Sequence, residues 1–308
     1  MIFKTSDDIT AITGSYYKNN NFAKVLPFLQ TAETKLAKII GKETVDKVET
    51  IFSSDKQSDD DKALLIMIQR PVAVMGTLEL YRHNDISHED TGRKIKIDAD
   101  KEKLPWEWQL QRDDDIQLND YYDAVDDLLA YLEDNKIDTW LVQKKRIAYK
   151  KLLIQDSDTF SEFWNIDSPR IFMQLVPLIS EAQRMWLIPA YGYSEDDFDA
   201  LLLKVQSGNA DSEPEYVYAA NALVLYTMYL AFKRGMYSII PQGVVQRNLQ
   251  SDGMYKGESI TYSMVNKYAE SLHRDADKML DKMKTVKNGN PVYDLLPDND
   301  KNNKYMML

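Results

Sequence analysis

Two long runs of apolar residues dominate the hydropathy pattern of this 308-residue chain. The first covers residues 63–81, and the second covers residues 216–232, about 151 residues later. Acidic residues precede each run and Lys or Arg follows it, and a helix dipole favours these charges at its two ends. The pattern predicts two long helices, each at the centre of its own helical core.

The segments around these two runs occur in the same order in both halves of the chain. Each half opens with a short apolar stretch and a Ser-Asp helix start, at residues 3–9 and 154–160. A helix that contains a proline, a short amphipathic helix, the central apolar run and a last amphipathic helix follow, at separations of 150 to 152 residues. This shared order favours an internal duplication. The alternative is one undivided helical domain.

We therefore predict a mainly all-α protein with two tandem, internally duplicated helical-bundle modules. The first module covers residues 1–150 and the second covers residues 151–286. Within the first module, residues 94–115 begin with alternating Lys and Ile, a pattern that predicts a short strand or hairpin. Residues 287–308 form an extended C-terminal tail, whose polar and irregular composition is typical of a disordered segment.

Charge and hydropathy narrow the range of partners. The formal net charge is −11, whereas binding to nucleic acid needs clustered Lys and Arg, so we expect no sequence-specific nucleic-acid partner. The run at 216–232 is short for a membrane span, and the run at 63–81 contains Arg70 and Pro71, which would be costly in lipid. We therefore expect buried helices in a protein with no membrane partner. The N-terminal residues also lack the pattern of a secretory signal.

We find no motif in the sequence that indicates catalysis or a cofactor. The chain has no cysteine and only three histidines, and it has neither a phosphate-binding loop nor a nucleophile elbow. His83, His88 and Glu89 do not have the spacing of a zinc site, and the acidic runs at 59–61 and 113–115 lack the glycine of a calcium loop. We expect no enzyme activity, no cofactor and no metal. A carboxylate site assembled from distant residues is the alternative.

The order of the elements resembles the small head-to-tail connector, or adaptor, proteins of tailed phages. The residues that carry this resemblance are 26–33, the run at 63–81 with Asp90-Thr91-Gly92 after it, and their partners in the second half. The chain also looks like an uncharacterised helical family carried in prophages of gut anaerobes. Typical adaptors have one such module, and this chain has two.

The resemblance implies a structural virion protein that assembles in the host cytoplasm. It would form a ring-like homo-oligomer that contacts the portal and tail proteins. The C-terminal tail would anchor each copy to its neighbour, because its apolar residues follow a polar spacer. The residues predicted for this contact are Tyr293, Leu295, Leu296, Tyr305, Met306, Met307 and Leu308. The alternative is a helical binding or scaffold protein without a virion role.

Overall fold

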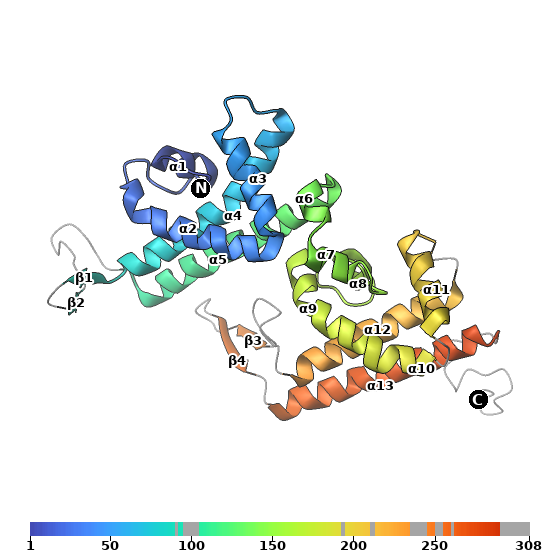
Figure 1. Ribbon diagram of the computed structural model, residues 1–308. Coiled ribbons are helices and arrows are strands. Elements are labelled where there is room, and N and C mark those ends of the chain that lie inside the picture. The colour runs from blue at the N-terminus through green and yellow to red at the C-terminus, as the bar shows by residue number, and fades with distance from the viewer. Residues whose placement is uncertain are drawn as a thin grey trace, which may run out of the picture. The chain divides into compact units, whose positions relative to one another are not determined.

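The computed structural model describes residues 1–89, 92–94, 105–191, 195–209, 213–234, 245–249, 255–259 and 262–289. The protein is mostly helical, which confirms the predicted fold class at this coarse level. The chain divides into two compact units, Met1–Ile147 and Ala148–Leu308. Figure 1 shows the elements of each unit.

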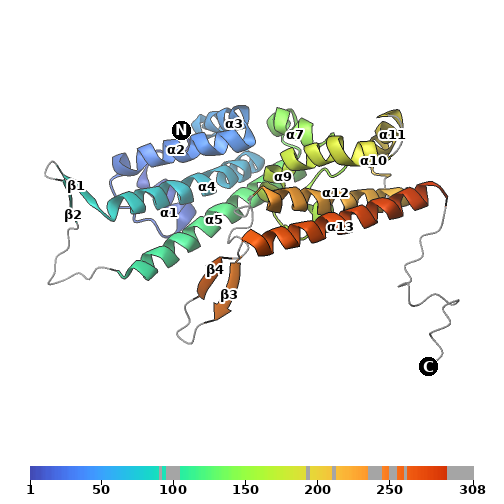
Figure 2. The ribbon, with the colours of Figure 1, turned by 90° about the horizontal axis from the view of Figure 1, so that it is seen from below.

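Unit 1 is built around α4, which contacts α1, α2, α3 and α5. Figure 2 shows α4 lying between α2 and α5. Strands β1 and β2 form an antiparallel pair after α4, and α7 crosses the boundary into unit 2. The elements are α1 (Ser6–Thr13), α2 (Phe22–Ile40), α3 (Lys42–Ser53), α4 (Asp59–Asn84), β1 (Ser87–Glu89), β2 (Gly92–Lys94), α5 (Glu107–Asp134), α6 (Asp138–Leu141) and α7 (Lys144–Tyr149).

A capping box fixes the start of α4. The Ser58 hydroxyl accepts a hydrogen bond from the Asp61 amide at 3.1 Å, and the Asp61 carboxylate accepts one from the Ser58 amide at 3.1 Å. These bonds satisfy two of the amides that a helix N-terminus leaves free. By length and composition, α4 could cross a membrane, but 67% of its most apolar stretch is buried inside the protein. That burial is typical of the core helix of a soluble protein.

The alternating Lys and Ile residues expected to form a strand lie mostly outside the described part of the chain. Lys94 ends β2, and residues 95–104 are not among the described residues. From Glu107 onward the chain belongs to α5. This helix starts because the Gln109 side chain accepts a hydrogen bond from the Trp106 amide at 2.9 Å, an interaction that hydropathy alternation does not reveal.

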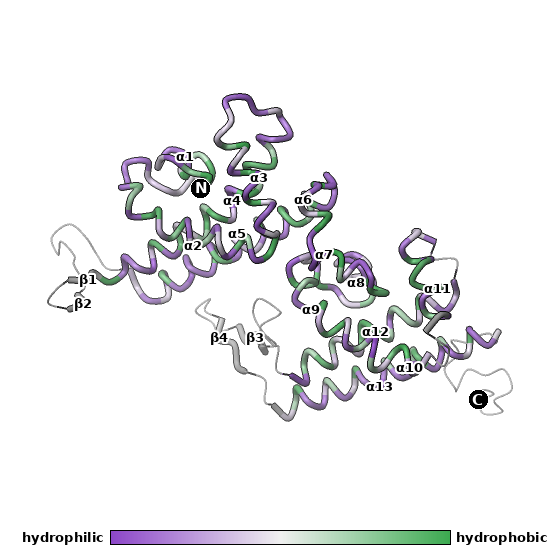
Figure 3. Tube along the Cα trace, viewed as in Figure 1, coloured by the Kyte–Doolittle hydropathy of each residue, from purple (hydrophilic) through white to green (hydrophobic). Residues whose placement is uncertain are grey.

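Unit 2 is built around α12, which contacts α9, η1 and α13. Helices α9 and α10 follow one another through η1, a single π-helical turn. In Figure 3 hydrophobic and hydrophilic residues alternate along α13, as expected for a helix with one buried face. The elements are α8 (Ser157–Ser161), α9 (Pro169–Ala182), η1 (Gln183–Leu187), α10 (Ile188–Tyr191), α11 (Glu195–Gln206), α12 (Pro214–Lys233), β3 (Val245–Leu249), β4 (Tyr255–Ser259) and α13 (Tyr262–Lys287).

Buried positions recur in the two units at a nearly constant separation. In α4 and α12 the separation is 151 residues, and in α5 and α13 it is the same. The pairs in α4 and α12 are Leu65/Tyr216, Ile68/Ala219, Val72/Leu223, Ala73/Val224, Thr77/Met228 and Leu80/Ala231. The pairs in α5 and α13 are Tyr121/Leu272, Val125/Ala276, Leu129/Leu280 and Leu132/Met283. Helix α4 therefore buries the same positions as α12, and α5 buries the same positions as α13, when the numbers are shifted by 151.

The proline-containing helices α2 and α9 show where this separation changes. Before η1 it is 150 residues, and after η1 it is 151. The pairs are Val25/Leu175, Leu29/Ile179 and Ala32/Ala182 before η1, and Leu36/Leu187 and Ile40/Tyr191 after it. A π-helical turn arises when one residue is inserted into an α-helix. The separation of these buried positions therefore changes by one residue at η1.

Each unit also buries the short apolar segment that precedes its first helix, and a buried glutamine binds the backbone of that segment. In unit 1, Gln69 Nε2 donates a hydrogen bond to the Ile2 carbonyl at 2.6 Å. In unit 2, Gln183 Oε1 accepts one from the Leu153 amide at 2.8 Å. Buried backbone groups need such partners, so these two glutamines hold the opening segments in place.

The Gln69→Leu variant should destabilise unit 1 by about 1–3 kcal/mol, because the buried Ile2 carbonyl loses its donor. Urea unfolding followed by circular dichroism measures this loss. The exposed change Gln30→Leu on α2 serves as the matched control and should leave the unfolding midpoint nearly unchanged. Equal midpoints for the Gln69→Leu variant and the wild type would contradict the anchoring role.

Gly76 marks the closest approach of α4 to α2. A Cβ atom at this position would lie 2.6 Å from Leu29 Cδ2 and 3.2 Å from the Leu29 Cα. The Leu29 side chain is buried, and it fills the space that the missing side chain leaves. Only glycine lets the two helices pack at this distance.

Gly76→Ala should therefore lower the free energy of unfolding by about 1–3 kcal/mol through overpacking, even though alanine favours a helix by about 1 kcal/mol. Thermal unfolding measures the loss. Adding Leu29→Ala to Gly76→Ala should cost less than the sum of the two single changes, because the smaller side chain removes the clash. Strict additivity would show that the two residues do not meet.

Candidate functional site

The residues predicted to form an interaction site in the C-terminal tail lie outside the described part of the chain. They are Tyr293, Leu295, Leu296, Tyr305, Met306, Met307 and Leu308. The residues just before the tail are described. At the end of α13, Lys287 Nζ lies 3.1 Å from the centroid of the Tyr191 ring, and burial lowers the pKa of Lys287 to about 8. The contact joins the end of α13 to α10, where the tail begins.

Within the described residues, no group of three or more His, Asp or Glu side chains could hold a metal ion. His83 packs against Phe28 with ring centroids 4.9 Å apart, and the side chains of His88 and Glu89 lie outside the description. In the two acidic runs, Asp61 caps α4 and Asp114 pairs with Arg82 at 2.9 Å. The acidic side chains with described contacts thus have structural roles.

A cavity of about 490 Å³ lies at one end of unit 1. It is bounded by the bend between α2 and α3 on one side and by α6 and α7 on the other. Its lining includes apolar and basic side chains, among them Ile39, Val142, Lys38, Lys144 and Lys145. The three lysines and Val142 are exposed. We call this cavity the basic groove.

Gly41 and Gln143 hold the two sides of the basic groove together. The Gln143 amide donates hydrogen bonds to the Glu43 carboxylate at 3.0 Å and to the Thr139 carbonyl at 3.1 Å, and the bond to Glu43 lowers the pKa of that carboxyl. Gly41 has φ +91° and ψ 145°, a region that is essentially restricted to glycine. A Cβ atom there would come within 2.1 Å of Gln143 Nε2.

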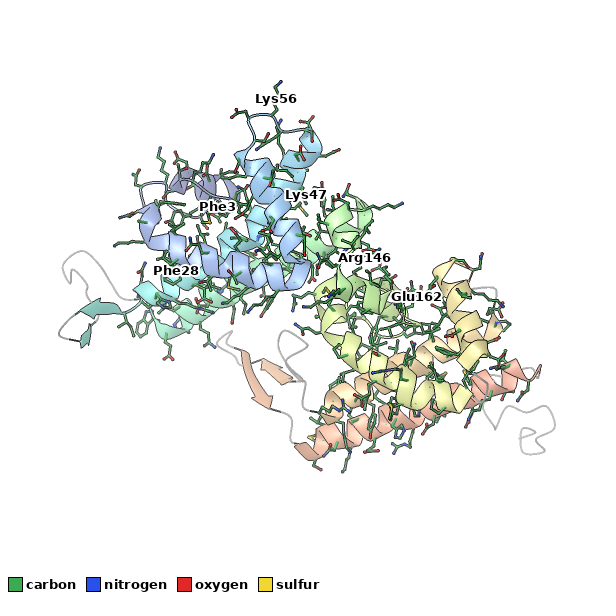
Figure 4. The ribbon with its side chains drawn as sticks, viewed as in Figure 1. Phe3, Phe28, Lys47, Lys56, Arg146 and Glu162 are labelled. Carbon is green, nitrogen blue, oxygen red and sulfur yellow. The ribbon has the colours of Figure 1, made fainter. Side chains whose placement is uncertain are left out.

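Ion pairs and hydrogen bonds then fix α6 and α7 to the rest of unit 1. Lys145 Nζ donates to the Lys38 carbonyl at the end of α2, at 2.7 Å, and Lys47 pairs with Asp138 at 2.7 Å. Arg146 donates to both carboxylate oxygens of Glu133 in α5, at 2.7 and 2.8 Å. Figure 4 labels Lys47 and Arg146. The basic groove therefore has walls held by several polar contacts.

The start of α5 presents a different surface. Trp106 is 71% exposed and Trp108 is 49% exposed, and Leu110 and Ile116 are exposed as well. Exposed acidic residues accompany them, including Asp113 and Asp115. Helix α5 has 28 residues, so it is about 42 Å long. Its far end leads into α6 beside the basic groove, so the two surfaces lie at opposite ends of this helix. We call residues 106–116 the aromatic start of α5.

Unit 2 has a partly exposed aromatic stack at the π-helical turn. Trp186 stacks on Tyr226 with ring centroids 4.2 Å apart, and Tyr229 stacks on His273 at 4.7 Å. Beside the stack, Arg234 donates to both carboxylate oxygens of Glu181 at 2.6 and 2.7 Å and lowers the pKa of that carboxyl. The π-helical turn thus contributes Trp186 to an aromatic cluster that the sequence pattern did not reveal.

Gly41→Ala should cost about 1–3 kcal/mol in backbone strain alone, and the clash with Gln143 adds to this loss. The double variant Gly41→Ala with Gln143→Ala should recover the part caused by the clash but keep the strain. Chemical unfolding of Gly41→Ala, Gln143→Ala and the double variant separates the two contributions. If Gly41→Ala is as stable as the wild type, the close contact across the basic groove does not exist.

Comparisons with known proteins place the chain in a family. No curated protein and no solved structure matches it. A family model described as "Family of unknown function (DUF6712)" matches residues 26–149 and 191–306, which together exceed half of the chain. The first match ends with the last residue of α7, and the second begins with the last residue of α10. The chain belongs to this family, DUF6712, whose function is unknown.

Proposed function

We propose that this protein is a structural component of a virion, in the head-to-tail connector ring of a tailed phage or prophage. The observation that carries the proposal is the recurrence of one helical arrangement, with the same element order and the same buried positions, in both units. Rigid bodies of this kind suit an assembly protein. We choose the head-to-tail connector as the assembly because the helix pattern resembles that of phage adaptor proteins.

We infer that the two units are tandem copies of one duplicated module. Each begins with a buried apolar segment and a capped short helix, and each has a proline-containing helix, a central buried helix, a strand pair and a long amphipathic helix. The constant separation of buried positions supports this origin, since unrelated bundles have no reason to share a separation over this length. The residue inserted at η1 accounts for the one change of separation within the second helix.

Protein contacts are the function that the described surfaces support best. The basic groove and the aromatic start of α5 carry exposed charges and exposed apolar side chains together, the composition found where proteins bind one another. In a connector, such surfaces would contact other copies in a ring, and also the portal and tail proteins. A net charge of −11 suits a part whose partners are proteins rather than DNA.

The mass of the protein in solution tests this function. Size-exclusion chromatography with light scattering should give an oligomer of many copies, and negative-stain electron microscopy should show closed rings. Deleting residues 290–308 should reduce the mass to that of a monomer, because the proposed arm is lost. The deletion leaves α13 complete, since it ends at Lys287, so helicity by circular dichroism should stay the same.

Two substituted chains serve as controls for the deletion. Changing Leu295 and Leu296 to Ser keeps the length of the tail and should also prevent assembly, whereas Asn302→Ser with Asn303→Ser should have no effect. Rings that persist without residues 290–308 would eliminate the arm. A wild-type monomer that also fails to bind a portal protein would favour the scaffold function instead.

A further inference from the structure

We propose that the aromatic start of α5 of one copy binds in the basic groove of a second copy, so that copies associate head to tail. This contact deepens the proposed function, and it rests on the self-association that the function requires. It concerns residues that the structure describes and is separate from the contact proposed for the C-terminal tail.

The aromatic start of α5 has the features of a binding element that the described residues of unit 1 leave exposed. Trp106 exposes most of its surface and Trp108 exposes about half, although folding normally buries tryptophan. Leu110 lies one turn after Trp106, so the two share a helix face. Tryptophan is among the residues that contribute most to binding when a partner covers them.

The basic groove offers the complementary shape and chemistry. Its volume of about 490 Å³ is large enough for an indole ring, and Val142, which is 67% exposed, gives it an apolar wall. The ammonium group of Lys145 is held by the Lys38 carbonyl at 2.7 Å, so this lysine is positioned before binding. A positioned ammonium group also attracts the face of an aromatic ring.

Charge selects this pairing from the other surfaces of the chain. The protein as a whole is acidic, with a net charge of −11, so two copies repel each other on average. The basic groove reverses that sign locally through Lys38, Lys144 and Lys145. The acidic residues Asp113 and Asp115 lie beside the exposed tryptophans. Two copies therefore attract each other where the aromatic start of α5 faces the basic groove.

The position of the two surfaces determines the kind of assembly. They are different surfaces, at opposite ends of a helix about 42 Å long. One contact between two copies therefore leaves an aromatic start free on one copy and a basic groove free on the other. Such a head-to-tail contact repeats until the chain of copies closes into a ring, or else it continues as a filament.

Two variants that each lose one surface test the contact. Trp106→Ala with Trp108→Ala removes the aromatic side chains, and Lys38→Glu with Lys144→Glu reverses the charge of the basic groove but keeps the bond of Lys145 that fixes α7. All four residues are exposed, so each variant should fold. Each alone should be a monomer by light scattering. An equimolar mixture should form a one-to-one dimer, because one intact surface of each kind remains, and a further copy could attach only through the tail, which does not hold the single variants together.

The control variant is Lys56→Glu with Lys62→Glu, which makes the same charge change at exposed positions of unit 1 that lie at the other end of α3 from the basic groove. Lys56 is labelled in Figure 4. This variant should keep the mass of the wild type. If either surface variant also keeps that mass, or if the mixture does not associate, the proposed contact is wrong.

Cysteine cross-linking tests the same contact without removing either surface. The chain has no cysteine of its own. A chain with Glu107→Cys and Val142→Cys should give a ladder of disulfide-linked multimers on a non-reducing gel. Each single variant should give no ladder on the same gel. A chain with Glu107→Cys and Lys56→Cys is the control and should give no ladder.

The combined outcomes separate this inference from the proposed function. Closed rings without a cross-linked ladder would overturn the contact and leave the connector role standing. A ladder from chains that form only open filaments would support the contact and count against a connector ring. No ladder from the double cysteine chain, together with a wild-type monomer that binds no portal protein, would overturn both.

Discussion

Each unit depends on covering one apolar helix from nearly every side. Helices α4 and α12 bury most of their circumference, and only a narrow strip, with Ile66 and Arg70 in α4 and Val217 in α12, is exposed. Each large apolar side chain that is removed from water contributes roughly 2 kcal/mol. The surrounding helices are therefore required as a set, because the loss of any one would expose part of this surface. That requirement explains why the two units have the same elements in the same order.

Close packing on these central helices then limits what may vary. In unit 1, Gly76 lets α2 approach α4. In unit 2, the position 151 residues later is Thr227, which is buried and donates its hydroxyl hydrogen to the Leu223 carbonyl at 2.7 Å within α12. The helix opposite α12 takes a π-helical turn. The two central helices thus differ at this position, with a glycine in unit 1 and a buried threonine in unit 2.

The periodic part of this fold could be predicted from the sequence, and the contacts between distant residues could not. The helical class follows from local patterns, and the structure confirms it. The basic groove depends on Gly41 and Gln143, which lie about a hundred residues apart and whose close contact no periodicity indicates. The π-helical turn likewise depends on packing, since the residues of η1 fit an ordinary helical pattern. The start of α5 also involves a single side chain, Gln109, which accepts a hydrogen bond from the Trp106 amide.

The proposed duplication also gives the C-terminal tail a counterpart in unit 1. There, the residues after α5 form α6 and α7, and they bind the bend between α2 and α3 through Gln143 and Lys145. The residues after α13 hold the same place in the order of unit 2. In unit 1 this contact is made within one copy. If the tail reached a neighbouring copy, the same kind of contact would instead be made between two copies. Such an exchange needs no new surface, because the duplicated module already contains both parts.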